Sequence, residues 1–167
     1  MIIRTIEKKD AELFLRLQRQ LDEETAFMLY EPGERKTTVR GQRKIIRNVL
    51  LSTNSTIIVA ENRAGRLVGY IGIFGSQLTR IRHVGYITIG ILNACCNQGL
   101  GRMFLAHGEQ FAKSVCISRL ELTVMAENRR AIHLYHKVGF QEEGRRERSL
   151  YVNGKWEDEL YMAKLID

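Results

Sequence analysis

The sequence predicts an α/β (α+β) protein with a single mixed, mostly antiparallel sheet of about seven strands, flanked by four helices. Short β-rich runs alternate with longer segments of helical periodicity, and two of the boundaries, 62–65 and 153–154, have the composition of hairpin turns. A strand, a helix and a strand over 87–125 follow each other so closely that they predict a parallel pair with a right-handed crossover. No repeat, low-complexity tract or linker divides the chain, so we expect residues 1–167 to form one domain.

The N-terminal part predicts one strand and two helices. Residues 2–6 form a short β-rich run, and Asp10 is a suitable N-cap for the helix that follows. Residues 22–33 contain the only proline, in a Pro-Gly pair that predicts a loop before a second helix over about 38–51. The apolar stripe of the first helix is Leu13, Leu17 and Leu21.

Both halves of the chain contain a hairpin signal. Runs over 56–61 and 66–74 flank a four-residue turn, and a further strand then runs to Leu92. Near the C-terminus a helix over 128–137 ends close to Gly139. The strands that follow, 140–152 and 155–166, are separated by an Asn-Gly pair, which favours a tight turn.

The segment 87–104 is the most informative one. An apolar β run leads through a short polar loop to Gly99-Leu-Gly101, which opens a helical pattern over 99–115, and a strand over 119–125 follows. The N–H groups of a first helical turn have no intrahelical acceptor, and the helix dipole adds partial positive charge. Glycine lets an anion approach this backbone closely. The loop is therefore a candidate phosphate site, with an ordinary helix start as the alternative.

Composition excludes several classes of protein. Hydrophobic residues make up 44% and charged residues 27%, and no apolar run approaches the ~20 residues that span a bilayer. Without a visible targeting segment we expect a soluble, cytoplasmic protein with no membrane partner. The three cysteines have no metal-like spacing, which favours reduced thiols.

The net charge of +7 is consistent with an anionic ligand. Cations occur on both sides of the glycine loop, which would suit a polyphosphate, although scattered surface charge is the alternative. A nucleic-acid-binding module would place cations and aromatic residues on one face. The aromatic residues here instead have core-facing periodicity, so we expect no nucleic-acid partner: Phe104, Phe111 and Phe140.

Two motifs carry a family resemblance. Gly99-Leu-Gly-Arg102, and then Asn128-Arg-Arg-Ala-Ile-His-Leu-Tyr135-His-Lys-Val-Gly-Phe140, resemble the GNAT superfamily of acetyl-CoA-dependent N-acetyltransferases. The resemblance covers nearly the whole chain, and the segment 142–162 is similar to that of small bacterial members. It implies the GNAT fold, in which the parallel fourth and fifth strands splay apart at the centre of the sheet.

The resemblance also implies an acetyl-CoA site. The backbone of Ile91 would bind the pantetheine arm, and Asn128 would contact that arm or order the start of its helix. Cys96 stands where the family usually has Gln or Arg; a nucleophilic Cys96 is an alternative, but no neighbouring residue supplies a base. The residues that would cradle the pyrophosphate are Asn97, Gln98, Gly99, Leu100, Gly101 and Arg102.

Acetyl transfer needs a proton donor for the departing thiolate and a base for the amine. Tyr135 suits the first task because its phenol stays protonated at neutral pH; packing between helix and sheet is the alternative. Glu121, on the predicted strand 119–125, is the first candidate base, although it could equally form an ion pair with an arginine. His83 is the second candidate.

The acceptor would be a primary amine: a small amine such as a polyamine or amino acid, or a protein α-amino group. A non-catalytic acyl-CoA-binding sensor is the alternative function, and a homodimer is compatible with the family. We expect no metal, because His133 and His136 have no third ligand in sequence. The 22–34 segment would attract a cationic acceptor through its carboxylates, which are Asp22, Glu23, Glu24, Glu31 and Glu34.

Overall fold

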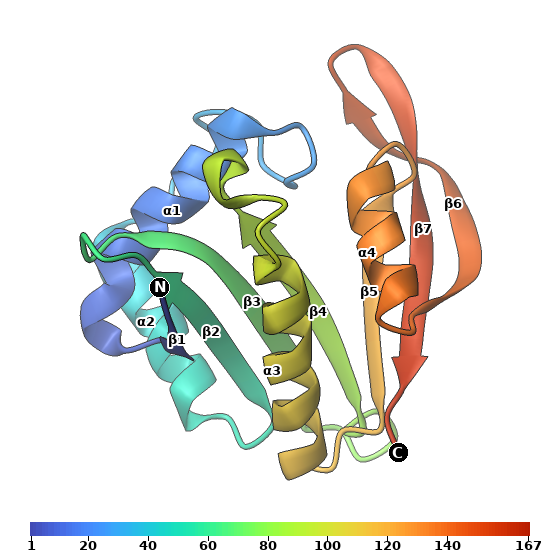
Figure 1. Ribbon diagram of the computed structural model, residues 1–167, viewed down its shortest axis with the longest axis horizontal. Helices are drawn as coiled ribbons and strands as arrows, with labels where there is room; N and C mark the ends of the chain where they lie inside the picture. The colour runs from blue at the N-terminus through green and yellow to red at the C-terminus, as the bar shows by residue number, and fades with distance from the viewer.

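The computed structural model describes residues 1–167 and contains one seven-stranded sheet in the order β1-β2-β3-β4-β5-β7-β6 (Figure 1). All neighbouring strands are antiparallel except β4 and β5, which are parallel. The predicted fold class and the predicted parallel pair are thus confirmed. The strands are β1 (Ile2–Thr5), β2 (Ser55–Glu61), β3 (Leu67–Gly75), β4 (Val84–Ile91), β5 (Arg119–Met125), β6 (Gln141–Val152) and β7 (Lys155–Leu165).

Helices cover both faces of the sheet. A Cβ added at Gly90 would contact Leu21 of α1, whereas a Cβ added at Gly69 would contact Phe104 of α3. Gly69 pairs with Ile91, the neighbour of Gly90, so the two positions face opposite sides of the sheet and α1 and α3 cover opposite faces. Gly101 of α3 approaches Leu134 of α4, which places these two helices side by side. None of the helices has the length and apolar character needed to cross a membrane. The helices are α1 (Ala11–Glu24), α2 (Val39–Leu51), α3 (Leu100–Ser114) and α4 (Arg129–Lys137), with short 3-10 turns η1 (Lys8–Asp10) and η2 (Asn93–Cys95).

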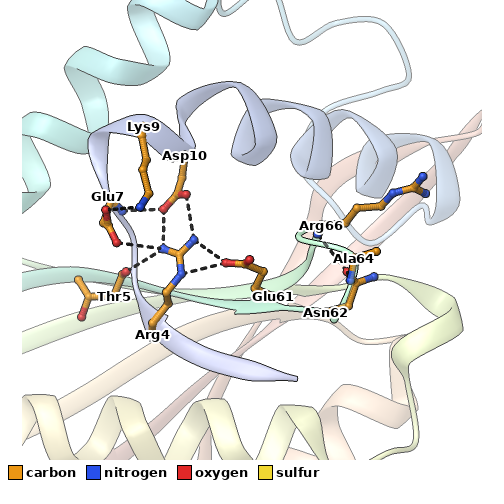
Figure 2. Close-up of polar contacts among 9 residues, drawn as sticks. All are labelled: Arg4, Thr5, Glu7, Lys9, Asp10, Glu61, Asn62, Ala64 and Arg66. Atoms are coloured by element: carbon orange, nitrogen blue, oxygen red, sulfur yellow. Dashed lines mark hydrogen bonds and ion pairs between the residues drawn. The ribbon is translucent and has the colours of Figure 1, made fainter.

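The predicted turns have the expected local chemistry. Asn62 closes the β2–β3 turn, because its side-chain oxygen accepts hydrogen bonds from the backbone N–H groups of Ala64 and Arg66, both at 3.0 Å (Figure 2). At the β6–β7 turn, Asn153 and Gly154 have φ values of 50° and 78°. Both central residues of a type I′ turn require such positive φ values.

Asp10 does not act as the predicted helix cap. It stands just before α1, but its buried carboxylate accepts hydrogen bonds from Arg4 at 2.6 and 2.9 Å and from the Glu7 backbone N–H at 2.8 Å (Figure 2). Arg4 also donates to Glu61, at 3.0 and 2.8 Å. A buried carboxylate is stabilised more by a bidentate guanidinium than by a single N–H group, which explains the difference. The cluster ties β1, the start of α1 and β2 together.

The parallel pair is short, and this shapes the centre of the molecule. Only three pairs of residues join β4 to β5, namely Val84 with Arg119, Gly85 with Leu120 and Tyr86 with Glu121. Beyond them β4 continues to Ile91 and β5 to Met125, and the two strands diverge (Figure 1). The predicted splay is therefore confirmed.

Candidate active site

A cavity of about 890 Å³ lies where β4 and β5 diverge. Its lining comes from both faces of the sheet: from α1 and the segment 25–37 on one side, and from the η2–α3 loop and α4 on the other. A molecule in this cavity can therefore extend through the sheet from one face to the other.

The edge of β4 that faces the cavity carries unpaired backbone groups. The N–H of Leu92 donates to Val68 of β3 at 3.0 Å. Because successive residues of a strand direct their backbone groups to opposite sides, those of Ile89 and Ile91 point toward the gap. The backbone at Ile91 thus has no strand partner on the side of the gap.

The start of α3 supplies further free donors. Gly99 has a φ of 81°, which glycine adopts without strain, and nothing lies within 4 Å of the position of a Cβ there. The first helical hydrogen bond runs from the Met103 N–H to the Gly99 carbonyl at 3.1 Å, so the N–H groups of Leu100, Gly101 and Arg102 precede it. With Asn97, these residues line the cavity, and the geometry fits an anionic group.

Two residues of the glycine loop have other roles. A Cβ at Gly101 would lie 2.6 Å from Leu134 Cδ2, so this glycine allows α3 and α4 to pack closely. The Gln98 side chain donates to the Ala94 carbonyl at 2.9 Å and does not line the cavity. Gly101 thus permits helix packing, and the Gln98 side chain stabilises the loop.

Cys96 has no catalytic partner. Its thiol lies 3.5 Å from the Leu92 carbonyl oxygen and 3.7 Å from that of Ile91, and it has no hydrogen bond to a histidine or carboxylate. The structure gives no support to a nucleophilic Cys96.

Helix α4 places Tyr135 at the cavity. Asn128 is the N-cap of α4, and its side-chain oxygen accepts from the Ala131 N–H at 3.2 Å, as predicted. Tyr135 is buried and lines the cavity. Burial raises the pKa of Tyr135 well above its usual value, and the nearby Tyr86 phenol raises it further. Tyr135 is therefore protonated at neutral pH.

Tyr86 reaches the same region from the opposite face. It alternates with Ile87 and shares the face of Gly90, which is the face covered by α1. Its hydroxyl lies 2.9 Å from Thr123 Oγ1, in a hydrogen bond that joins β4 to β5 just beyond their last paired residues. The phenol groups of Tyr86 and Tyr135 thus line the cavity from opposite faces of the sheet, where β4 and β5 separate.

Neither predicted base lies at the cavity. Glu121 is within the paired part of β5, accepts a hydrogen bond from Arg119 at 2.9 Å and is absent from the lining. His83 is exposed before β4, where its carbonyl accepts from the Ser118 and Arg119 N–H groups. The ion-pair alternative therefore describes Glu121 better than the base hypothesis.

Sequence reasoning missed Glu159, the one carboxylate that lines the cavity. It lies opposite Met125 in the β5–β7 register, on the face that also carries Thr123, and is 9% exposed. Its carboxylate is 2.9 Å from Arg146 Nη1. Only the pairing of β7 with β5 brings Glu159 to this place, and no local signal in sequence marks it.

The carboxylates of the acidic segment 22–34 lie outside the cavity lining. The segment 25–37 does face the cavity, but with Phe27, Met28, Tyr30 and other uncharged side chains, and with Arg35. Asp22 is buried against Arg35, and Glu24 accepts from the Asn93 N–H at 2.8 Å. The carboxylates are outside the lining because hydrogen bonds and solvent stabilise their charge there.

The histidines of α4 have no metal-binding geometry. His133 lines the cavity, whereas His136 Nδ1 lies 3.2 Å from the Phe140 carbonyl oxygen. No group of three or more His, Cys, Asp or Glu side chains is close enough to hold a metal ion.

Two curated relatives resemble part of the chain. The L-amino acid N-acetyltransferase AaaT of Escherichia coli is 30% identical over 102 residues, which cover 60% of this chain and 63% of that protein. The N-alpha-acetyltransferase RimI of Mycobacterium tuberculosis is 38% identical over 98 residues, or 58% of this chain and 59% of that protein. The matched region thus spans about three-fifths of these relatives.

Solved structures match over the whole chain. The acetyltransferase of GNAT family from Streptococcus pneumoniae has a TM-score of 0.95 and 32% identity, and 99% of each chain is covered. YncA from Salmonella typhimurium, solved with its cofactor acetyl-CoA, has a TM-score of 0.88 at 20% identity over 100% of this chain and 94% of that one, which shows a shared fold. The acetyltransferase (GNAT) family pattern itself matches residues 15–140. This chain therefore belongs to the GNAT acetyltransferase family.

Proposed function

We propose that this protein transfers the acetyl group of acetyl-CoA to a primary amine, by direct attack and without an acyl-enzyme. The observation that carries the proposal is the cavity between β4 and β5, which joins an unpaired strand edge to the free N–H groups of a helix start. A pantetheine arm with two amides and a pyrophosphate have the chemistry that these two features accept. The AaaT and RimI relatives, whose names describe N-acetyltransferases, support the proposal.

In this proposal the chain binds acetyl-CoA in two parts. The backbone of Asn97, Leu100, Gly101 and Arg102 holds the pyrophosphate, with Gly99 leaving room for it. The pantetheine arm lies along Ile91, and Asn128 orders the start of α4 beside it. The exposed Arg102 side chain adds positive charge at the phosphate end.

Tyr135 is proposed to protonate the leaving group. The amine nitrogen attacks the thioester carbon, the new C–N bond forms, and the C–S bond breaks with its electron pair on sulfur. Tyr135 donates its phenolic proton to the thiolate and regains a proton from solvent. Because burial keeps this phenol protonated, the donor is present at neutral pH.

Glu159 is proposed to receive the proton that the amine loses, through water in the cavity. It is better placed than Glu121 because it lines the cavity on the face that carries Tyr86 and Thr123. The hydrogen bond from Arg146 holds the Glu159 carboxylate in place at the cavity wall.

The test is a thiol-release assay with acetyl-CoA and a panel of amino acids, polyamines and peptides. We expect amine-dependent release of coenzyme A and a product heavier than the amine by one acetyl group, detected by mass spectrometry. An acyl-CoA-binding sensor would bind acetyl-CoA in calorimetry but release no thiol with any amine. That result would refute the enzymatic function and favour the sensor.

A further inference from the structure

Arg35 is the only cation that lines the cavity from the side of α1 and α2; the other three cationic lining residues belong to α3 and α4. Its Nε and Nη2 donate to the two oxygens of Asp22 at 2.6 and 2.9 Å, and its guanidinium lies 4.2 Å from the centre of the Tyr30 ring. The side chain is 10% exposed. These contacts fix the guanidinium and leave Nη1 without a hydrogen bond to the protein.

Gln18 supplies an unpaired acceptor nearby. Its Oε1 atom is buried, has no hydrogen-bond partner and belongs to a residue that lines the cavity. Gln18 precedes Asp22 by one turn of α1, so it lies beside the Arg35 pair. A buried oxygen that accepts no hydrogen bond destabilises the folded protein, and a hydrogen bond from a ligand N–H would remove this penalty.

Thr88 places these groups beside strand β4. The Tyr70 hydroxyl lies beside Gln18 and Thr88, and Thr88 is on β4 between Ile87 and Ile89. The unpaired acceptor of Gln18 therefore lies close to the part of β4 that borders the gap, and Arg35 belongs to the same group of side chains around Tyr70.

We propose, on the basis of the proposed acetyltransferase function, that the acceptor is an α-amino acid. Its carboxylate binds the free Nη1 edge of Arg35, and an N–H of its amino group donates to Gln18 Oε1, so that the amine faces the thioester. A polyamine would instead place a second ammonium near Arg35, where no free carboxylate lines the cavity. Phe27, Met28 and Ile45 also line this side, which favours an apolar side chain.

The first test compares three amines that share one side chain: L-leucine, L-leucinamide and isopentylamine. With correction for the unprotonated fraction of each amine, we expect kcat/KM for leucine to exceed the other two by about 10²-fold or more, as for other sites that lose a charged partner. Leucine should also raise the Tm of the protein saturated with coenzyme A, and leucinamide should do so less. Equal use of the three amines, or preference for isopentylamine, would overturn the proposal.

The second test removes the guanidinium without leaving a buried charge. In the double variant Asp22→Asn/Arg35→Gln, the preference for leucine over leucinamide should fall to about threefold or less, while KM for acetyl-CoA stays the same. Lys36→Gln, a neutralised neighbour outside this cavity, should keep the preference. If the double variant does not fold, the comparison of the three amines with the unmodified protein still tests whether the acceptor is an α-amino acid.

The two proposals fail in different ways. Thiol release with isopentylamine as fast as with leucine would leave the acetyltransferase function standing and remove the Arg35 assignment. No thiol release with any of the amine panel, despite acetyl-CoA binding, would remove the function itself. A preference that persists in Asp22→Asn/Arg35→Gln would show that other groups bind the carboxylate.

Discussion

At the scale of single residues, the sequence predicts the residues of the proposed cofactor site better than those of the proposed acceptor site. Gly99, Asn128 and Tyr135 belong to segments contiguous in sequence, and all three line the cavity. Glu159 and Arg35 reach it only because β7 pairs with β5 and because the loop after α1 folds back onto Asp22. Such contacts between segments distant in sequence produce no periodicity or motif from which they could be predicted. The same limit explains why Glu121 lies outside the cavity: strand alternation predicts the face of the sheet on which a side chain lies, but not its distance from the gap.

Tyr135→Phe should reduce turnover about 10²- to 10⁴-fold and leave acetyl-CoA affinity nearly unchanged, because only the donating hydroxyl is lost. Single-turnover kinetics measure the chemical step directly. The control is Tyr161→Phe, at an exposed tyrosine outside the lining. Undiminished single-turnover rates would make Tyr135 a packing residue.

Glu159→Gln should reduce kcat about 10²-fold or more, since the variant can no longer take the proton from the amine. Arg146 is 43% exposed in its side chain, so water can replace its lost partner and folding should be little affected. Glu157→Gln, on the same strand but outside the lining, is the control. An unchanged kcat in Glu159→Gln would assign the base elsewhere.

Gly99 tests the anion site. Asparagine tolerates a positive φ, so Gly99→Asn keeps the loop backbone and adds only a side chain, whereas Gly99→Val also introduces strain. We expect calorimetry to show acetyl-CoA affinity reduced about tenfold or more in both, or roughly 1.4 kcal/mol. Gly65→Asn, at a φ of 72° in the β2–β3 turn, should bind normally. Normal binding by Gly99→Asn would remove the phosphate assignment.

At the scale of elements, the predicted bounds lie within one or two residues of the observed ones wherever the sequence predicts both bounds, because apolar periodicity and turn composition are local signals. The end of α1 and the start of β4 have no such signal. The contacts between elements are less predictable. Asp10 has the composition of a helix cap but forms an ion pair with Arg4, a residue of the preceding strand. Gly101 belongs to a phosphate motif but also makes room for Leu134 of another helix.

The Arg4 cluster should make stability depend on pH. Burial alone would raise the pKa of Asp10, but hydrogen bonds from Arg4 and the Glu7 N–H lower it below its ordinary value of 3.8. A lowered pKa gives stability that is present above about pH 4 and lost as the pH falls through the folded-state pKa. Asp10→Asn should thus lower the free energy of unfolding by about 1–3 kcal/mol at pH 7 and by less at pH 3.

Urea unfolding at the two pH values measures this difference. Glu7→Gln, which removes a carboxylate with an exposed side chain from the same cluster, should change stability by less than about 1 kcal/mol. A destabilisation by Asp10→Asn that is equal at pH 7 and pH 3 would contradict the role of its charge.

At the scale of the whole molecule, the family resemblance predicts the splay between β4 and β5, which no local pattern in either strand reveals. The cause lies in distant parts of the chain: β4 is held by β3, β5 is held by β7, and only three pairs of residues join the two strands. The molecule is therefore two half-sheets that share a short seam, with the Tyr86–Thr123 hydrogen bond at its end.

A seam of only three residue pairs links the stability of the protein to any ligand that fills the gap. A ligand whose amides fill the gap would act as a missing strand, and its binding would stabilise the folded state in proportion to the logarithm of its concentration above Kd. In hydrogen exchange, the N–H groups of Ile89 and Ile91 should exchange fast in the free protein and slow down on addition of acetyl-CoA. The N–H of Leu92, already bonded to Val68, should be protected in both states. In the proposed complex, acetyl-CoA thus takes the place of a missing strand, and a shortage of acetyl-CoA would leave the protein in its less stable form.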